Sequence, residues 1–395
     1  MSQPIRKSIV NGGNVSLEPI YTLLIDGNNL LRQSFADEKI NSDGVHYGAV
    51  FQFFLQIKLL LRKKNYDYVY VTFDDEDSGI MRYNIYKGYK ANRMKKYAEH
   101  AEGLGEYGRE FEEKLKSMEK YIYGKKGKKK EYHMSDTEKF VDENFARERD
   151  IILDMCEELC IRTLFNKTSE GDDFISYYVQ NKLPNEYIVI VSTDNDLMQL
   201  ISDTVCVYDR KNGVYLSPER FKRIKGYPVE NVVVKKILLG DTSDNIGGIY
   251  GFSENRLKEL VPEFMDRAIT IEEVKERAQQ RIDERISQKK KPLAWCKNIV
   301  DGVTSREYDG DFYDINRRLI DLSKPLLSAE AKDEIDAYMH KPINTDGRNF
   351  ENLYQIVKEE KMEQLLQPSS FSSFFCEYQP LMDKEIKRFK SQILS

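Results

Sequence analysis

Several acidic residues that are far apart in the chain each follow an apolar run, and their type and spacing suit metal chemistry. None has an obvious Lys or Arg beside it in the sequence, although like-charged carboxylates cannot share a dry cleft unless a cation holds them. Two hard divalent cations, Mg²⁺ with Mn²⁺ as a substitute, would resolve the repulsion and could support phosphodiester hydrolysis. The candidate ligands are Asp26, Asp74, Glu170, Asp172, Asp173, Asp194, Asp196, Asp241 and Asp244.

Strand and helix patterns place most of these carboxylates at one edge of a sheet. Apolar runs rich in β-branched and aromatic residues predict strands at 21–25, 66–73, 160–165, 187–192 and 204–208. Helices are expected between them, at 50–61 and 171–183. This alternation predicts an α/β fold with a mostly parallel central sheet flanked by helices. Such sheets bind ligands beyond the carboxyl ends of their strands, where Asp26, Asp74 and Asp194 fall.

The overall charge of −5 conceals a basic segment. Residues 81–130 hold fifteen Lys/Arg and seven Asp/Glu, a net charge of +8, which suits a polyanion guided to a metal site. The stretch 94–147 interrupts the strand and helix rhythm, and two interpretations stay open: a solvated or disordered insertion, or a mobile helical arch that contacts phosphates. Its candidate phosphate ligands are Lys125, Lys126, Lys128, Lys129 and Lys130.

The second half of the chain has a different character. After an N-terminal extension (1–20) and a core that contains the predicted sheet (21–225), the segment 226–395 is expected to be helical. Within it, residues 229–260 predict two helices joined by a hairpin that contains glycine. Backbone N–H groups near Gly248 and Gly251 in this hairpin would face a phosphate. Residues 265–292 predict one highly charged helix.

Composition narrows the remaining classes of function. Five scattered cysteines suit a reducing compartment, and Cys156 and Cys160 read as a buried apolar pair because no other Cys or His completes zinc-finger spacing. Four histidines make a mechanism based on His unexpected. No apolar run is long enough to span a membrane and no signal-peptide core is visible, so we expect a cytoplasmic monomer, in the host cytoplasm if a bacteriophage encodes it.

The order of the motifs resembles that of the structure-specific 5′ nucleases, which include flap endonucleases, the 5′-nuclease domains of bacterial DNA polymerase I, and phage 5′→3′ exonucleases and RNase H enzymes. The phage members look most similar. The resemblance covers about residues 20–325. It rests on IDGNN (25–29), FD (73–74), YKANR (89–93), EGDD (170–173), STDND (192–196), GDTSDN (240–245) with GGIYGF after it, and NRRLIDL (316–322).

This resemblance implies a role for each matching position. It implies a PIN-like nuclease core with a helical arch and a helix-3-turn-helix region. Asp26, Asp74, Glu170 and Asp172 match the first metal site. Asp173, Asp194, Asp196 and Asp244 match the second, and Asp241 matches a supporting carboxylate, with a helix or loop cap as the alternative for Asp173 and Asp241. Lys90 and Arg93 match a basic pair on the scissile phosphate, and Arg82 is a phosphate ligand or a structural ion pair.

The chain departs from the family pattern at two places. Gly171 replaces the usual Ala of the E-A-D-D motif, and Phe252-Ser253-Glu254 stands at the end of the hairpin, where the family binds a K⁺ ion. The expected function is a two-metal 5′→3′ exonuclease or flap endonuclease acting in DNA replication or repair. Its substrates would be 5′ flaps, nicks or 5′ ends of DNA and RNA–DNA primer hybrids.

Alternatives to this function stay open. A PIN-like ribonuclease would not need the glycine hairpin, a Toprim-type domain leaves Asp26 and Asp74 unexplained, and a non-catalytic junction-binding protein would be expected to lose some carboxylates. The partner proteins that this function would suggest are a sliding clamp or a single-strand-binding protein. Residues 367–375 (QPSSFSSFF) resemble a clamp-binding peptide only faintly, and packing of Phe371, Phe374 and Phe375 into the C-terminal region is the favoured interpretation.

Overall fold

The structure is a computed structural model that describes residues 9–11, 14–75, 78–93, 135–164 and 168–393. The chain divides into two compact units, each described here by itself. Unit 1 comprises Met1–Asp75, Lys139–Tyr215 and Leu327–Ser395, and unit 2 comprises Glu76–Glu138 and Leu216–Leu326. None of the described helices has both the length and the apolar character needed to cross a membrane.

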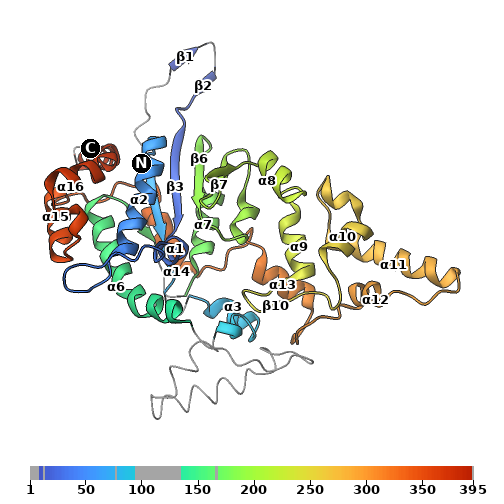
Figure 1. Cartoon of the computed structure of the whole chain (residues 1–395). Helices are drawn as coiled ribbons and strands as arrows, with labels where there is room; N and C mark the ends of the chain where they lie inside the picture. The colour runs from blue at the N-terminus through green and yellow to red at the C-terminus, as the bar shows by residue number, and fades with distance from the viewer. Residues whose placement is uncertain (1–8, 12–13, 76–77, 94–134, 165–167, 394–395) are drawn as a thin grey trace. The chain divides into compact units, whose positions relative to one another are not determined.

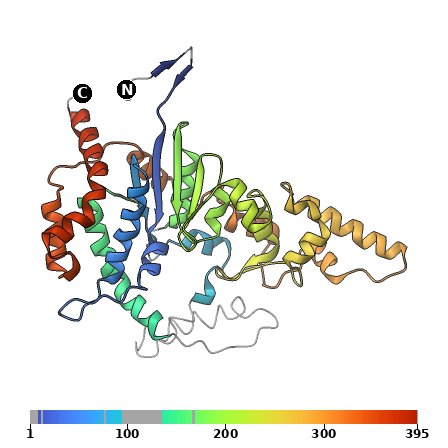
Figure 2. The same cartoon turned by 45° about the horizontal axis from the view of Figure 1, so that its top comes forward.

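Unit 1 is built on a six-stranded sheet in the order β5-β4-β3-β6-β7-β8, of which β3, β6 and β7 are seen side by side in Figure 1, and Figure 2 shows the same sheet after a turn. The pairs β4–β5, β3–β4, β3–β6 and β6–β7 are parallel, which confirms the predicted α/β fold. The strands are β3 (Ile20–Asp26), β4 (Tyr68–Thr72), β5 (Arg162–Leu164), β6 (Glu186–Val191), β7 (Val205–Asp209) and β8 (Val214–Leu216). A short hairpin, β1 (Ile9–Asn11) with β2 (Asn14–Ser16), precedes them.

Two faces of this sheet bury different side chains because successive residues of a strand alternate in direction. Leu23, Ile25, Val69 and Val71 join one large core together with α2 (Gly48–Lys63) and α6 (Asp136–Glu158). On α6, the buried Cys156 belongs to this core, and Cys160, which follows the helix, is buried as well, so the predicted apolar pair is confirmed. Helices α1 (Gly27–Ser34) and α7 (Gly171–Gln180) begin beside the carboxyl ends of the strands.

The C-terminal helices return to unit 1 rather than extending unit 2. They are α14 (Ala329–Tyr338), α15 (Phe350–Glu359), α16 (Pro368–Phe375) and α17 (Gln379–Ile393). Phe371, Phe374 and Phe375 are buried in the same core as α2, which confirms the packing interpretation of this aromatic segment. The prediction grouped 226–395 into one helical region, whereas the structure assigns 327–395 to unit 1.

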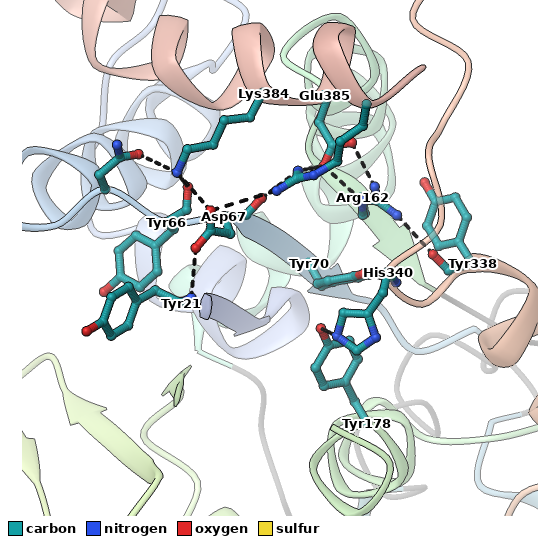
Figure 3. A network of polar contacts seen from close by, with 12 residues as sticks. Tyr21, Tyr66, Asp67, Tyr70, Arg162, Tyr178, Tyr338, His340, Lys384 and Glu385 are labelled. Atoms are coloured by element: carbon teal, nitrogen blue, oxygen red, sulfur yellow. Dashed lines mark hydrogen bonds and ion pairs between the residues drawn. The ribbon is translucent and has the colours of Figure 1, made fainter. Parts of the chain in front are cut away.

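A buried polar network holds this C-terminal segment in place (Figure 3). Arg162 on β5 forms an ion pair of 2.8 Å with Glu385 on α17, and neither side chain is exposed. Lys384 pairs with Asp67 at 3.1 Å, and Asp67 also accepts a hydrogen bond of 3.0 Å from the Tyr21 backbone N–H. A contact between residues so distant in sequence leaves no local pattern, so the sequence did not reveal it.

Unit 2 is helical around a two-stranded hairpin. Its elements are α3 (Ile80–Ile85), α8 (Pro218–Lys225), α9 (Asn231–Leu239), β9 (Gly240–Asp241), β10 (Ile246–Gly247), α10 (Glu254–Leu260), α11 (Ile271–Ser287), α12 (Ala294–Asp301) and α13 (Phe312–Ile320). The predicted order of helix, hairpin and helix is present as α9, β9–β10 and α10. The predicted charged helix at 265–292 is the shorter α11, which packs along α12 (Figures 1 and 2).

Candidate active site

Three strands of unit 1 deliver carboxylates to one edge of the sheet. Asp26 is the last residue of β3 and pairs in register with Thr72 on β4, so Asp74 lies two residues beyond that position. Asp194 follows β6, the neighbour of β3 on the other side. Because these strands are parallel and adjacent, their carboxyl ends meet, and the sequence prediction of a common edge is confirmed.

Asp26 also organises the start of α1. Its side chain caps the helix by accepting a 3.0 Å hydrogen bond from the Asn29 backbone N–H, and its other oxygen accepts one of 2.8 Å from the Ser192 hydroxyl. The Ser192 hydroxyl in turn accepts from the Asp194 N–H at 3.0 Å. The loop after β6 is therefore tied directly to the end of β3.

The first turn of α7 adds three more acidic residues. Glu170 is its N-cap, and Asp172 and Asp173 lie in its first turn. The Gly171 backbone N–H donates to Oδ1 of Asp74 at 2.6 Å, which joins this helix to the end of β4. Asp172 is partly buried, whereas the Asp173 side chain is completely buried.

The glycine at position 171 is explained by crowding. A Cβ atom there would lie 3.0 Å from Oγ1 of Thr72 and 3.2 Å from Oδ1 of Asp74, closer than an ordinary van der Waals contact. Where the resembled family carries Ala, this chain brings the α7 backbone up to Asp74 without a side chain between them. The departure in sequence therefore has a local structural cause.

These carboxylates are close enough for the charge of one to raise the pKa of another, as the values for Asp26 and Asp172 show. Burial first, and then the charges of Asp74 and Asp194, raise the pKa of Asp26 to about 7, against the hydrogen bonds from Asn29 and Ser192. The pKa of Asp172 is raised well above its usual range, first by burial and then by Asp194, Asp26, Asp74 and Glu170. The five mutually repelling groups, called the carboxylate cluster below, are Asp26, Asp74, Glu170, Asp172 and Asp194.

The chemistry of the carboxylate cluster suits a hard divalent cation. All its donor atoms are carboxylate oxygens, which are the ligands that Mg²⁺ and Mn²⁺ prefer. The pKa of Asp26 and Asp172 is raised by burial first and by neighbouring carboxylates second, and a bound cation would offset both effects. Within the described residues, no three acidic, His or Cys side chains are close enough in their present conformations to form a ready-made coordination sphere. Binding would therefore draw the side chains together.

Asp196 lies just beyond the carboxylate cluster. It begins the 3₁₀ helix Asp196–Leu200, and its backbone N–H donates to Oδ1 of Asp194 at 2.8 Å. This bond joins the backbone of Asp196 to the side chain of Asp194 within the STDND loop (192–196).

Asp241 and Asp244 lie in unit 2 and have local partners there. Asp241 forms a 2.7 Å ion pair with Lys236 and accepts hydrogen bonds from Ser243. Burial alone would raise the pKa of Asp241, but Lys236 and then Ser243 outweigh it and hold that pKa below its usual range. This supports the loop-cap alternative for Asp241. Asp244 accepts a 3.3 Å hydrogen bond from the Tyr89 hydroxyl.

The predicted basic residues of unit 2 differ in their surroundings. Lys90 has a left-handed backbone (φ 52°), donates its N–H to the Asp244 carbonyl at 2.9 Å, and places its ammonium 4.9 Å from the Tyr89 ring centre. Arg82 is buried and its Nε donates to the Leu319 carbonyl at 3.1 Å, which supports a structural role rather than a phosphate contact. Arg93 lies in the short 3₁₀ helix Ala91–Arg93, and its side chain is outside the described structure.

The hairpin of unit 2 needs glycine for close backbone packing. A Cβ on Gly248 would lie 2.2 Å from the Leu239 carbonyl carbon, and Gly240 has a φ of 77°. Gly251 also has a positive φ (72°), with space around its Cα. The five predicted arch lysines, Lys125, Lys126, Lys128, Lys129 and Lys130, lie outside the described residues.

Sequence reasoning missed residues that orient the carboxylate cluster. The Asn29 side-chain oxygen accepts from both the N–H and the hydroxyl of Thr193 at 3.1 Å, and from the Gln33 amide at 2.7 Å. Gln33 also donates to the Thr193 hydroxyl at 2.5 Å. The IDGNN motif marked Asn29 as part of a pattern, but only the structure shows that α1 holds the loop before Asp194.

Comparisons with known proteins agree with this geometry. The family model described as "5'-3' exonuclease, N-terminal resolvase-like domain" matches residues 21–226. DNA polymerase I of Bacillus subtilis is 24% identical over 289 residues, which is 71% of this chain and 28% of that protein. A 5'-3' exonuclease of Mycoplasmopsis pulmonis is 24% identical over 61% of this chain and 66% of its own length. The chain thus spans only about a quarter of the polymerase.

Solved structures share the fold. The T5 5'-exonuclease with bound zinc has a TM-score of 0.54 at 18% identity, covering 86% of this chain and 98% of that one. The T5 D15 flap endonuclease, in a pseudo-enzyme-product complex with DNA and metal ions, has the same TM-score and identity. At this identity the likeness establishes a common fold, consistent with the PIN-like core expected from the sequence.

Proposed function

The chain belongs to the 5′-3′ exonuclease family with an N-terminal resolvase-like domain, and from that premise we propose that it hydrolyses phosphodiesters at 5′ ends or 5′ flaps of duplex DNA. The observation that carries the proposal is the carboxylate cluster at the carboxyl edge of a parallel sheet, where burial and the charges of the neighbouring carboxylates raise the pKa of Asp26 and Asp172. RNA primers on DNA are a second substrate of the same proposed chemistry.

The proposed cofactors are two divalent cations, Mg²⁺ with Mn²⁺ as a substitute. Bound at the cluster, they would supply Lewis acidity to the phosphoryl group and lower the pKa of water at neutral pH. Asp26, Asp74, Glu170 and Asp172 would hold one ion, and Asp194 with Asp196 would hold the other. Ser192 and Asn29 orient these ligands through the bonds described above.

Unit 2 would contribute recognition of the nucleic acid. Its α9–hairpin–α10 segment can present backbone N–H groups to duplex phosphates, which fixes orientation without reading sequence. Lys90 would neutralise charge on a substrate phosphate. K⁺ binding at the hairpin remains part of the same proposal, and Asp241, already paired with Lys236, is left with a supporting role.

A labelled 5′-flap substrate tests the proposal. Asp194→Asn should lower the single-turnover cleavage rate by about 10³-fold in saturating Mg²⁺ while leaving duplex affinity close to that of the wild type, because only charge at the cluster is lost. Asp203→Asn, a change of the same kind at an exposed position outside the cluster, serves as the matched control. Near-wild-type cleavage by Asp194→Asn would remove the basis for the assignment.

Two alternatives predict other results. A PIN-like ribonuclease would cleave single-stranded RNA and ignore the flap junction. A non-catalytic junction-binding protein would bind the flap and leave it intact with either Mg²⁺ or Mn²⁺.

A further inference from the structure

A cavity of about 500 Å³ lies in unit 1 at the C-terminal end of α1. Its lining combines α1, the segment after it, α2 and the end of β7, and it includes Gln33, Asp37, Glu38, Gln52 and Arg210. The volume falls within the range of about 300–1,000 Å³ typical of small-molecule pockets. No function considered so far uses it.

The cavity is connected to the cluster through α1. Gln33 lies on the wall of the cavity and donates to the hydroxyl of Thr193, the residue before Asp194. Asp26 caps the same helix two turns earlier, which corresponds to about 10 Å along the helix axis. A strand whose phosphate occupies the cluster would thus carry a neighbouring nucleotide within reach of the cavity, since stacked nucleotides rise about 3.4 Å each.

Arg210 supplies the donor side of the cavity. Its side chain is partly buried, and among the described residues it has no hydrogen bond or ion pair. Burial lowers the pKa of its guanidinium. A half-buried guanidinium facing a cavity offers a planar fork of N–H donors to a ligand.

The opposite side offers mainly acceptors. Both amide hydrogens of Gln33 are already used, on Asn29 and Thr193, so only its oxygen remains for a ligand. The Gln52 amide donates to Asp37 at 2.8 Å, which leaves its oxygen and one N–H. The exposed Glu38 carboxylate adds a third acceptor.

This donor and acceptor pattern discriminates between ligands. A phosphate would meet the Glu38 carboxylate in the same cavity and be repelled, whereas the Asp37 carboxylate is already paired with Lys39. A guanine base offers acceptors (O6 and N7) on one edge, the commonest specific partner of Arg, and N–H donors on the next edge for carboxylate or amide oxygens. Adenine lacks the O6 acceptor, and thymine lacks the amino donor.

We propose that the cavity lined by Arg210, Gln33, Gln52 and Glu38 binds an unstacked guanine base of the cleaved strand, within a few nucleotides of the scissile phosphate. The inference rests on the proposed nuclease function. It adds a base preference to an activity whose other expected contacts go to the sugar–phosphate backbone.

A cleavage experiment on full-length protein tests the role of Arg210. Single-turnover rates are measured on 5′ flaps in which each of the three nucleotides on either side of the junction is guanine, thymine or abasic. We expect one position where wild-type protein prefers guanine by about tenfold, in line with about 1–3 kcal/mol for a bidentate base contact. Arg210→Gln should lose that preference, whereas Lys211→Gln, an exposed neighbouring charge change, should keep it. A preference absent from the wild type, or unchanged in Arg210→Gln, overturns the proposal.

A binding experiment separates this proposal from the nuclease function. Saturation-transfer NMR with free guanosine or thymidine needs no cleavage, and inorganic phosphate is added as a competitor. We expect transfer to guanosine in the wild type and in Asp194→Asn, and its loss in Arg210→Gln. If the wild type fails to cleave any flap but guanosine still binds, the nuclease proposal is wrong and the assignment of the cavity as a guanine-binding site is kept. Displacement of guanosine by millimolar-scale phosphate, or no transfer to guanosine, contradicts the pocket.

Discussion

The backbone N–H of Gly171 donates to Oδ1 of Asp74 at 2.6 Å, so the first turn of α7 and the end of β4 are joined by a single short bond. This bond brings Glu170 and Asp172 to the edge of the sheet where Asp26 and Asp194 already lie. Two segments nearly 100 residues apart therefore supply one cluster, and the absent Cβ at position 171 allows their approach.

Replacing Gly171 tests that approach. In Gly171→Ala the new Cβ must displace Thr72 or Asp74 by a few tenths of an ångström, so Mn²⁺ affinity measured by calorimetry should fall several-fold. Gly171→Val should reduce it by tenfold or more (about 1.4 kcal/mol). The free energy of unfolding should change by only about 1 kcal/mol in Gly171→Ala. Unchanged Mn²⁺ affinity in both variants would show that the N–H bond tolerates a side chain.

The raised pKa of Asp26 predicts how metal-free protein responds to pH. The folded state holds a proton on Asp26 up to about pH 7, whereas the unfolded chain releases it near 3.8. Between those values the folded state binds more protons, so the free energy of unfolding in chelator falls as pH rises. Urea titrations at several pH values should show a shallower decline in Asp26→Asn than in the wild type.

The pH experiment has two internal checks. Glu148 raises the pKa of His46 despite burial, which also removes stability as pH rises, so only the difference between wild type and Asp26→Asn reports on Asp26. Adding Mg²⁺ should stabilise the wild type more at about pH 8 than at about pH 5, because protons and cations compete for the same carboxylates. Equal stabilisation at both pH values would contradict a shared site.

The ion pair between Arg162 and Glu385 predicts that the C-terminal segment is part of the folded core of unit 1. Glu385→Gln leaves the guanidinium buried without its counter-charge, which should lower the free energy of unfolding by about 3–5 kcal/mol. Lys387→Gln on the exposed face of the same helix should change it by less than about 0.5 kcal/mol. Equal effects of the two changes, measured by urea denaturation, would mean that α17 is a peripheral addition.

The hairpin of unit 2 makes a separate prediction about duplex binding. Gly248→Ala places a Cβ 2.2 Å from the Leu239 carbonyl carbon, so the hairpin must rearrange and duplex affinity should fall by about tenfold or more. Gly251→Ala has space for its Cβ and meets only the strain of a positive φ, so the loss should be smaller. Anisotropy titrations over a range of salt concentrations measure both. A larger loss in Gly251→Ala would reverse the assigned roles.

Features that depend on local pattern could be predicted from the sequence. The strands β3, β4 and β6 were visible as β-branched and aromatic runs, and the first acidic residue after each run identified Asp26, Asp74 and Asp194. Parallel pairing then required these carboxylates to share an edge. The burial of Phe371, Phe374 and Phe375 was also predicted, because this segment lacks the aliphatic residue and the spacing of a clamp-binding peptide.

Features that depend on contacts between distant residues could not be predicted. Nothing near Arg162 in the sequence indicates that its partner is Glu385, so residues 327–395 were grouped with the helical region instead of unit 1. The burial of Arg82 and the ion pair of Asp241 with Lys236 likewise require tertiary structure. The cavity beside Arg210 combines residues from four segments, none of which forms a motif.

The central claim is that the carboxylate cluster binds the divalent cations that cleavage requires, and anomalous diffraction from crystals grown with Mn²⁺ tests it most directly. We expect two Mn²⁺ peaks in unit 1, one beside Asp26, Asp74, Glu170 and Asp172 and one beside Asp194 and Asp196. In Asp194→Asn the second peak should weaken or vanish. Mn²⁺ bound elsewhere in the protein, with none at the cluster, would contradict the account.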